Sequence, residues 1–325
     1  MIISTIRFNF ALPGLDPAEN ARRHRAAVTI AQAADRAGLQ NVSLEEHHGV
    51  HHDGQPLGWC ASPFTIAAAV LAVTERVTVG LWGIALPLHD PVRVAEDVAT
   101  LDLLGPGRVV LVVNAGYRAA EFDAHGVDFD DRDQLFDTKL AALLAAWSDG
   151  STTTPVPATR PHPMVLVGGA SVADARRAAA HQLAFRPSAD RAELRTAYDA
   201  ACEAHGHHPL YLPPPADVHI VQVADDPDEW WQAVGPHLLL EAQVYASWLT
   251  DDDHSAVHSR AATVDELRAE GRYQVLTPGQ AVELAHRSGS ILFHPLCGGT
   301  PLDRAEQSAA LFIDDVLPRL DRQTG

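Results

Sequence analysis

The chain has 325 residues, of which 46% are hydrophobic and 20% are charged, a composition typical of a globular protein with a large core. Its net charge is −18 with histidine counted neutral, so DNA or RNA would be repelled and nucleic acid is not an expected partner. No apolar run approaches the roughly 20 residues that span a bilayer, and residues 1–10 lack the features of a signal peptide, so we expect a cytoplasmic protein. Cys60, Cys202 and Cys297 are far apart, which argues against a disulfide framework and against a cysteine zinc site.

Short apolar, β-branched runs alternate with longer alanine-rich helical stretches. Eight strands are predicted, near residues 2–9, 41–46, 77–86, 108–114, 163–168, 182–186, 217–223 and 290–294. A helical pattern follows each strand, and repeated strand–helix units are typical of a parallel sheet with helical crossovers. Eight units predict one α/β domain over residues 1–325, a (β/α)8 TIM barrel. An open doubly wound sheet is the alternative.

Capping residues mark the predicted helix starts. One helix is expected to begin at Asp16-Pro17 and another at Asp90-Pro91, because the carboxylate can accept from free amide groups and proline needs no donor. Three polar or mixed stretches interrupt the repeat and are interpreted as insertions: residues 149–162, 206–216 and 247–289. Residues 49–61 and 247–289 are candidate lids, since long insertions in compact domains often cover a site.

Four histidines follow the second predicted strand. The run Glu45-Glu46-His47-His48 ends that strand, and His51 and His52 come soon after. A histidine at a strand end of a parallel barrel can exchange a proton near neutral pH, and a neighbouring carboxylate can orient it. Catalytic metals usually collect ligands from several strand ends, so we favour acid–base use of one histidine and expect no metal.

The later strands end in turns that could hold a phosphorylated ring. Gly116, within Asn114-Ala115-Gly116-Tyr117, would let a planar ring or phosphate approach the backbone. The turn Gly168-Gly169-Ala170-Ser171 leads into a predicted helix, whose first amide groups suit a phosphate. Arg186 could supply a charged partner for the same phosphate. Ordinary tight turns with surface side chains are the alternative at both places.

Several short motifs occur in a specific order along the chain. They are Glu46-His47-His48, Ser62-Pro63, Leu86-Pro87, Asp90-Pro91-Val92-Arg93, Gly116-Tyr117-Arg118, Val167-Gly168-Gly169 and Phe293-His294-Pro295-Leu296. In this order and spacing, the chain resembles the bacterial luciferase-like monooxygenase family over most of its length. The resemblance implies a (β/α)8 barrel with insertions, commonly a homodimer. It also implies reduced FMN with O2, or a deazaflavin coenzyme for hydride transfer without O2.

The resemblance further implies roles for individual residues. His47 would face the reactive part of the ring as an acid or base, tuned by Glu46 or Glu45. The residues expected to bind the cofactor are Trp82, Gly83, Asn114, Ala115, Gly116, Tyr117, Gly168, Gly169, Ala170, Ser171 and Arg186. An apolar wall of Leu81, Trp82 and Ile84 would exclude water. Many members have a non-prolyl cis peptide in a bulge near the third strand's end, which predicts a cis bond at Trp82-Gly83.

The leading hypothesis is therefore a flavin-dependent monooxygenase that acts on a small organic substrate with reduced FMN from a separate flavin reductase. Asn114 and Ala115 stand where the luciferases have a reactive cysteine and an arginine, so light emission is not expected and Arg186 is expected to replace the lost phosphate contact. A deazaflavin oxidoreductase is the second hypothesis. The others are a metal-dependent barrel hydrolase using His47, His48 or the histidines at 51 and 52, and a non-catalytic flavin-binding barrel.

Overall fold

The computed structural model describes residues 2–215, 219–249 and 259–320. Its main strands are β1 (Ile3–Phe8), β2 (Asn41–Glu45), β5 (Thr78–Ala85), β6 (Val109–Asn114), β7 (Met164–Gly169), β8 (Ala184–Pro187), β9 (Ile220–Val223), β10 (Tyr273–Leu276) and β11 (Ser290–Phe293). All pair in parallel, in the order β10-β9-β11-β1-β2-β5-β6-β7-β8. A separate hairpin joins β3 (His51–His52) and β4 (Gln55–Pro56). All eight predicted strands are present, and the predicted barrel class is confirmed.

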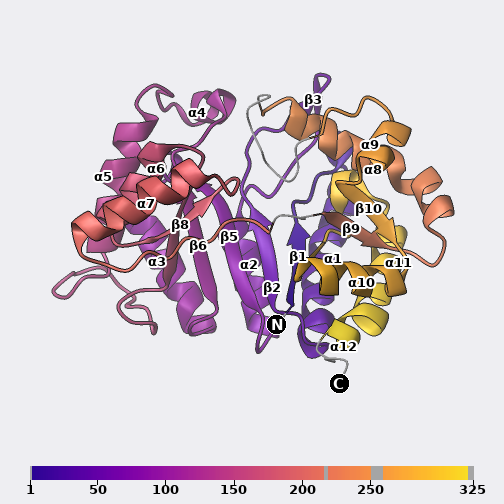
Figure 1. The fold of residues 1–325 in the computed structure, drawn as a ribbon, viewed down its shortest axis with the longest axis horizontal. Helices are drawn as coiled ribbons and strands as arrows, with labels where there is room; N and C mark the ends of the chain where they lie inside the picture. The colour runs from indigo at the N-terminus through magenta and orange to yellow at the C-terminus, as the bar shows by residue number, and fades with distance from the viewer. Residues whose placement is uncertain (1, 216–218, 250–258, 321–325) are drawn as a thin grey trace.

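Helices follow the strands and cover the outside of the sheet (Figure 1). They are α1 (Pro17–Arg36), α2 (Pro63–Val73), α3 (Pro91–Leu104), α4 (Ala119–His125), α5 (Arg132–Ala145), α6 (Val172–Ala180), α7 (Ala192–His205), α8 (Pro227–Ala246), α9 (Val264–Glu270), α10 (Pro278–Ser288), α11 (Leu302–Leu311) and α12 (Leu317–Leu320). Short helical turns occupy Pro13–Leu15, Leu86–Leu88, Cys297–Gly299 and Phe312–Val316. The side chains of Asp16 and Asp90 accept from the amides of Glu19 and Arg93, as the capping pattern predicts.

Alternation along the strands separates two faces of the sheet. Val42 and Leu44 of β2, like Leu81 of β5, are fully buried in the core with helical side chains such as Ala27 and Val70. Residues one position away, including Ser43, Gly80 and Trp82, line a cavity inside the barrel. Because successive side chains of a strand point to opposite faces, the sheet has an outer core against the helices and an open interior. None of the described helices is long and apolar enough to cross a membrane.

The predicted insertions differ from one another in structure. Residues 149–162 contain turns without a helix or strand, as expected. Residues 250–258 of the stretch 247–289 lie outside the described residues, and the rest includes α9, β10 and α10, with β10 paired to β9. Of the stretch 206–216, residue 216 is likewise outside the described residues. The preceding part attaches to the edge of the sheet, where the Leu212 amide donates to the Phe185 carbonyl at 2.9 Å beside β8. In the part of the chain that the structure describes, this segment accompanies β8 and no backbone pairing joins β8 to β9.

The end of β5 has the predicted bulge but not the predicted cis bond. The pairing of β5 with β6 shifts register between Leu81 and Ile84. The cis peptide bonds among the described residues are Thr154–Pro155 and Arg160–Pro161, so the prediction for Trp82–Gly83 was wrong. Gly83 has φ +71°, a left-handed conformation that glycine adopts without a Cβ penalty. The bulge therefore takes up its extra residue through this glycine.

Gly298 should be among the least replaceable small residues. Its φ is +55°, and an added Cβ would collide with the carbonyl oxygen of His237. We expect Gly298→Ala to lower the free energy of unfolding by about 2–4 kcal/mol through backbone strain and overpacking, measured by urea denaturation. Gly279→Ala is the matched control, since no atom lies within 4 Å of its added Cβ. Equal unfolding midpoints for the two variants would contradict the described packing around Gly298.

Candidate active site

His47 lies just beyond the carboxyl end of β2, with 7% of its surface exposed. Its Nδ1 is 3.0 Å from Oε1 of Glu121, and its Nε2 is 3.3 Å from the Tyr117 hydroxyl. A carboxylate can only accept, so Nδ1–H is the donor to Glu121. This assigns the tautomer and leaves Nε2 as the nitrogen that can exchange a proton, beside Tyr117.

Glu121 of α4 collects three donors on one oxygen. Besides His47, the backbone amide of His48 donates at 2.9 Å and Nη1 of Arg118 at 2.6 Å. Burial raises the pKa of the Glu121 carboxyl, but the bond from His47 and the other donors outweigh burial and bring that pKa below its ordinary value. Glu121 is therefore ionised at neutral pH and orients the imidazole. The sequence-based expectation of Glu46 or Glu45 in this place was wrong.

The two glutamates at the end of β2 point to different partners. Glu45 faces inward, where Nη2 of Arg7 lies 2.6 Å and the Tyr245 hydroxyl 2.9 Å from its Oε2. Glu46 faces the other way and is 3% exposed. Adjacent strand residues alternate between the faces of a sheet, which explains why Glu46 does not reach the His47 ring nitrogens, whereas Glu45 is taken by Arg7 and Tyr245.

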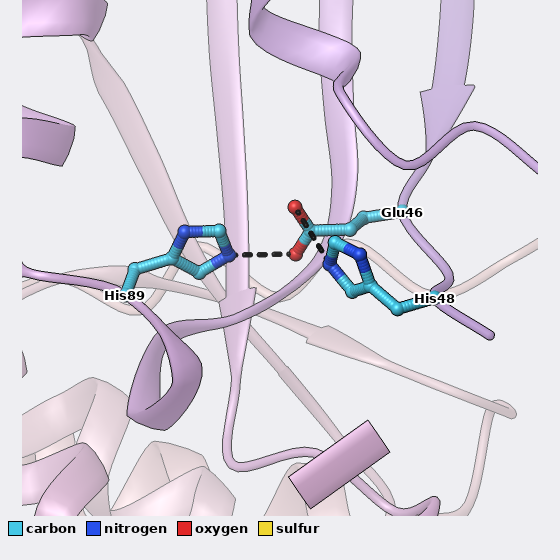
Figure 2. A group of neighbouring side chains, drawn as sticks. All are labelled: Glu46, His48 and His89. Atoms are coloured by element: carbon cyan, nitrogen blue, oxygen red, sulfur yellow. Dashed lines mark hydrogen bonds and ion pairs between the residues drawn. The ribbon is translucent and has the colours of Figure 1, made fainter. Parts of the chain in front are cut away.

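Glu46 lies between two histidines from different loops (Figure 2). Nε2 of His89 donates to its Oε2 at 2.9 Å, and Nε2 of His48 is 3.6 Å from its Oε1. Burial raises the pKa of the Glu46 carboxyl, but the two histidines outweigh burial and hold that pKa at about 2. The bond to Glu46 in turn raises the pKa of His48. The cluster is an ion-pair network in the wall behind His47.

Two groups of side chains have the composition and spacing to hold a metal ion. In one, the ligand atoms of Glu46, His48 and His89 all lie within 4.8 Å of one another. The other consists of Glu241, His294 and Cys297, all buried. Neither group was predicted from the sequence, because each combines residues that are far apart in the chain. His51 is exposed and His52 lies near Asp53, so these two histidines join neither group.

The Glu46 network predicts a loss of stability in acid. A carboxyl whose folded-state pKa is depressed contributes stability above its unfolded-state pKa, here near 4.5, and loses it as pH falls toward about 2. The difference between the unfolded-state and folded-state pKa of Glu46 corresponds to roughly 3 kcal/mol of folding stability. We expect wild type to lose stability between pH 5 and pH 2 more steeply than Glu46→Gln, in urea denaturation at each pH. Glu203→Gln, an exposed control, should follow wild type. Parallel curves for wild type and Glu46→Gln would contradict the network.

Aromatic rings enclose His47. Ring centroids lie 4.7 Å away for Trp248, 5.8 Å for Tyr117, 6.0 Å for Trp59 and 6.4 Å for Tyr245. Trp59 belongs to the predicted lid 49–61 and Trp248 to the predicted lid 247–289, so each stretch brings an indole to the same imidazole. The enclosure keeps bulk water from His47. The sequence had led us to expect this role for Leu81, Trp82 and Ile84.

That predicted apolar wall is corrected by the burial pattern. Leu81 and Ile84 are fully buried in the core cluster and do not reach the site. Trp82 alone of the three faces the barrel interior. Arg118 adds a cation to the enclosure, since its guanidinium lies 4.0 Å from the Trp248 ring centroid and donates to the His48 carbonyl at 3.1 Å.

The ends of β5 and β6 place the predicted ring-binding stretch beside His47. Ala85 is paired with Asn114, so the Gly83 bulge and the turn after β6 are neighbours. The Gly116 amide donates to Oδ1 of Asn114 at 2.9 Å and shapes the turn that presents Tyr117 to His47. His47 and the stretch from Asn114 to Tyr117 are thus brought together at one end of the barrel.

The turn from Gly168 to Ser171 follows β7, which is the neighbour of β6. Ser171 caps α6, and its amide and hydroxyl both donate to Oδ2 of Asp174, at 3.1 and 2.6 Å. Nη1 of Arg177 lies 3.1 Å from Oδ1 of Asp174. The turn is therefore at the same end of the barrel, but a carboxylate already occupies the Ser171 donors. A phosphate there would have to displace Asp174 or use the neighbouring amides.

Arg186 points into the barrel interior. Its Nη1 donates to the Leu212 carbonyl at 2.7 Å, and its guanidinium carbon is 5.2 Å from the Trp82 ring centroid. Its backbone pairs with Gly168, yet no bond joins its side chain to the described residues of the 168–171 turn. The three cysteines are buried free thiols, as the sequence predicted.

The chain matches the family model described as luciferase-like monooxygenase over residues 7–312. This match spans most of the molecule, and the chain belongs to the luciferase-like monooxygenase family. The alkanal monooxygenase alpha chain of the Kryptophanaron alfredi symbiont is 30% identical over 142 residues, which are 44% of this chain and 38% of that protein. Protein YddN of Bacillus subtilis is 33% identical over 162 residues, 47% of this chain and 45% of its own. These matches cover less than half of each relative.

Solved structures extend the likeness to the whole fold. Monooxygenase RslO1 from Streptomyces bottropensis has a TM-score of 0.74 at 23% identity, covering 98% of this chain and 99% of its own. The oxygenating constituent of 3,6-diketocamphane monooxygenase from Pseudomonas putida, in complex with FMN, has a TM-score of 0.66 at 16% identity and covers 98% of both chains. An F420-dependent secondary alcohol dehydrogenase has a TM-score of 0.65 at 16% identity, covering 99% of both chains. At these identities the likeness establishes the luciferase-like barrel fold.

Proposed function

We propose that this protein is a flavin-dependent monooxygenase that oxidises a small organic substrate at the carboxyl ends of its strands. The observation that carries the proposal is the orientation of His47. Glu121 fixes its Nδ1–H, while its Nε2 lies beside Tyr117 within the aromatic enclosure. Such an imidazole can hold or move one proton in a site sheltered from water. Family membership supports the same class of chemistry.

The residues around His47 suit a flavin ring. Tyr117 and the imidazole present polar atoms, the β5 bulge at Gly83 leaves space without a side chain, and the aromatic rings provide apolar surface. We propose that Asn114, Ala115 and Gly116 border the ring with Trp82. The phosphate would contact Gly168, Gly169, Ala170 and Ser171, which requires Ser171 to release Asp174. A bound reduced flavin supplies electrons and, with O2, the oxygen atom that is transferred.

The chain's own residues would then bind and orient the reactants and move a proton to or from them. Nε2 of His47 gives or takes the proton, with Glu121 stabilising the imidazolium across Nδ1. Trp59 and Trp248 exclude water. Glu46 would act on this site through its hydrogen bond from His89 and its charge contact with His48, the residue that follows His47. We propose Glu46 as a residue that supports the site by this network.

Cofactor titration separates the two cofactor hypotheses. We expect reduced FMN to quench the tryptophan fluorescence of the protein, because indoles line the proposed site. The FMN complex of the diketocamphane enzyme supports FMN, and the F420-dependent dehydrogenase supports the deazaflavin alternative. Saturable quenching by FMN with oxygen uptake in the presence of a flavin reductase is the predicted result. Binding of the deazaflavin coenzyme alone would contradict the monooxygenase proposal.

We further propose that the protein is a homodimer and receives its reduced flavin from a partner reductase. Apolar side chains lie exposed on α2 and α3, which pack against each other: Val73, Val92, Leu103 and Leu104 are 36%, 45%, 50% and 47% exposed. An apolar helix face of this kind is typical of a subunit interface. One chain has a mass of 34.9 kDa, and analytical ultracentrifugation should give twice this value. A single-chain mass at micromolar concentration would contradict the dimer.

A further inference from the structure

The inside of the barrel holds a mainly apolar cavity of about 500 Å³. Inward-facing side chains such as Thr5, Ser43 and Trp82 line it, together with Leu166 and the segment 211–213 beside β8. The indole of Trp82 folds back over Gly80, where an added Cβ would collide with its Nε1. The volume lies within the range of pockets that enclose small organic ligands. A barrel of this class is normally filled by side chains, so this interior space requires an explanation.

Arg186 brings a positive charge into this cavity, and no described residue supplies a free counter-charge to it. The cavity's one described lining carboxylate, Glu45, is already taken by Arg7 at 2.6 Å. Arg186 forms no ion pair with any residue of 2–215, 219–249 or 259–320, and its side chain contacts the Leu212 carbonyl and the Trp82 ring. Burial lowers the pKa of Arg186 to about 10, so it stays charged at neutral pH. A guanidinium has five N–H donors, and one carbonyl uses only one of them.

We propose that Arg186 holds the acidic group of the organic substrate, which is a mainly apolar monoanion, such as a carboxylic acid, whose body fills the barrel cavity. The Arg186 side chain is half-buried in a mainly apolar cavity, where a charge without a partner is unfavourable, and a carboxylate could pair with the free N–H groups of its guanidinium through two hydrogen bonds. The apolar lining and the Trp82 indole would pack against the hydrocarbon part of the acid.

The position of the cavity links it to the proposed reaction. Its lining runs from the first residues of β1, β2 and β5, which are Ile3, Asn41 and Thr78, to Glu45, the last residue of β2. Tyr245 bonds to Glu45 at 2.9 Å, and its ring is 6.4 Å from that of His47. The Glu45 end of the cavity is therefore next to the aromatic enclosure of His47, and the body of an acid held by Arg186 would occupy the interior between this end and the amino ends of the strands. What happens to the acid rests on the proposed monooxygenase function, whereas its binding does not need a flavin.

Binding to flavin-free protein tests the inference. The probes are benzoate, 2-naphthoate and decanoate, each compared with the alcohol of the same skeleton by isothermal titration calorimetry. We expect at least one acid to bind about tenfold or more tightly than its alcohol. Arg186→Met should weaken that acid about 10- to 100-fold, the range for a charge-assisted hydrogen-bonded pair, and leave the alcohol unchanged. Arg268→Met is the matched control, since this exposed arginine on α9 pairs with Asp228 and contacts no residue of the cavity lining.

The same guanidinium could instead serve a cofactor phosphate, so FMN and riboflavin form the second arm. If Arg186→Met weakens FMN tenfold or more and spares riboflavin, Arg186 binds the cofactor phosphate and the proposal is overturned. It is also overturned if no acid binds more tightly than its alcohol in wild type. If an acid binds through Arg186 while neither FMN nor the deazaflavin binds, the anion pocket stands and the proposed function fails.

Discussion

Replacing His47 with alanine should lower turnover about 10²- to 10⁴-fold while FMN affinity stays nearly unchanged. This range is the usual contribution of one positioned acid–base group. Nε2 is the only ring nitrogen free for proton exchange, because Nδ1 is held by Glu121 at 3.0 Å. Flavin affinity should persist, since the proposed ring contacts come chiefly from the ends of β5 and β6. Steady-state kinetics and fluorescence titration measure the two quantities separately.

His51→Ala is the matched control for this experiment. His51 is exposed in the β3 hairpin only four positions away, and its Nδ1 contacts the Gly49 carbonyl at 2.9 Å. Its replacement should leave turnover unchanged. If His47→Ala retains wild-type turnover, or loses turnover only because it no longer binds FMN, His47 has no acid–base role.

Replacing Glu121 with glutamine should lower kcat about 100-fold or more and displace the pH–rate profile. The amide removes the charge that faces the imidazolium and can turn its NH2 toward Nδ1, which favours the wrong tautomer; an analogous loss of the orienting carboxylate in serine proteases has a larger effect still. Without that charge the imidazolium gives up its proton more readily, so the profile should move to lower pH. Glu121→Asp should rescue part of kcat.

A double-mutant cycle distinguishes positioning from a merely structural role. If Glu121 acts through His47, then adding Glu121→Gln to His47→Ala should cause little further loss of kcat. Full additivity of the two losses, with an unshifted pH profile, would mean that Glu121 only supports the fold around Arg118 and His48.

The fold was largely predictable because its strands are long enough to carry an apolar signal. β6 (Val109–Asn114) consists of four valines and one leucine before Asn114, and the Asp90 cap marks α3 without tertiary information. β10 was missed because Tyr273–Leu276 lies in a mixed polar and apolar stretch, whereas β8, β9 and β11, which are equally short, lie in clearer apolar runs. The cis bond was inferred from resemblance alone, and Gly83 satisfies the bulge in another way.

The sequence predicted where the site lies in the barrel, but it did not predict which side chains contact His47. Parallel strand ends meet at one edge of the sheet, which brings His47 and Tyr117 together across 70 residues. Glu121 lies 74 residues from His47 on a helix, and nothing local marks it as the orienting carboxylate. The sequence itself argued against Glu46, since adjacent strand residues face opposite ways. Trp248 comes from still farther along the chain, and only the folded barrel places it over the imidazole.

A crystal structure of the protein soaked with FMN tests the central claim most directly. We predict density for the ring beside Nε2 of His47, between the turns at Asn114–Tyr117 and 168–171, with Asp174 turned away from Ser171. Density for FMN on any other face, or an ordered crystal in which this mouth excludes the flavin at saturating concentration, would contradict the account.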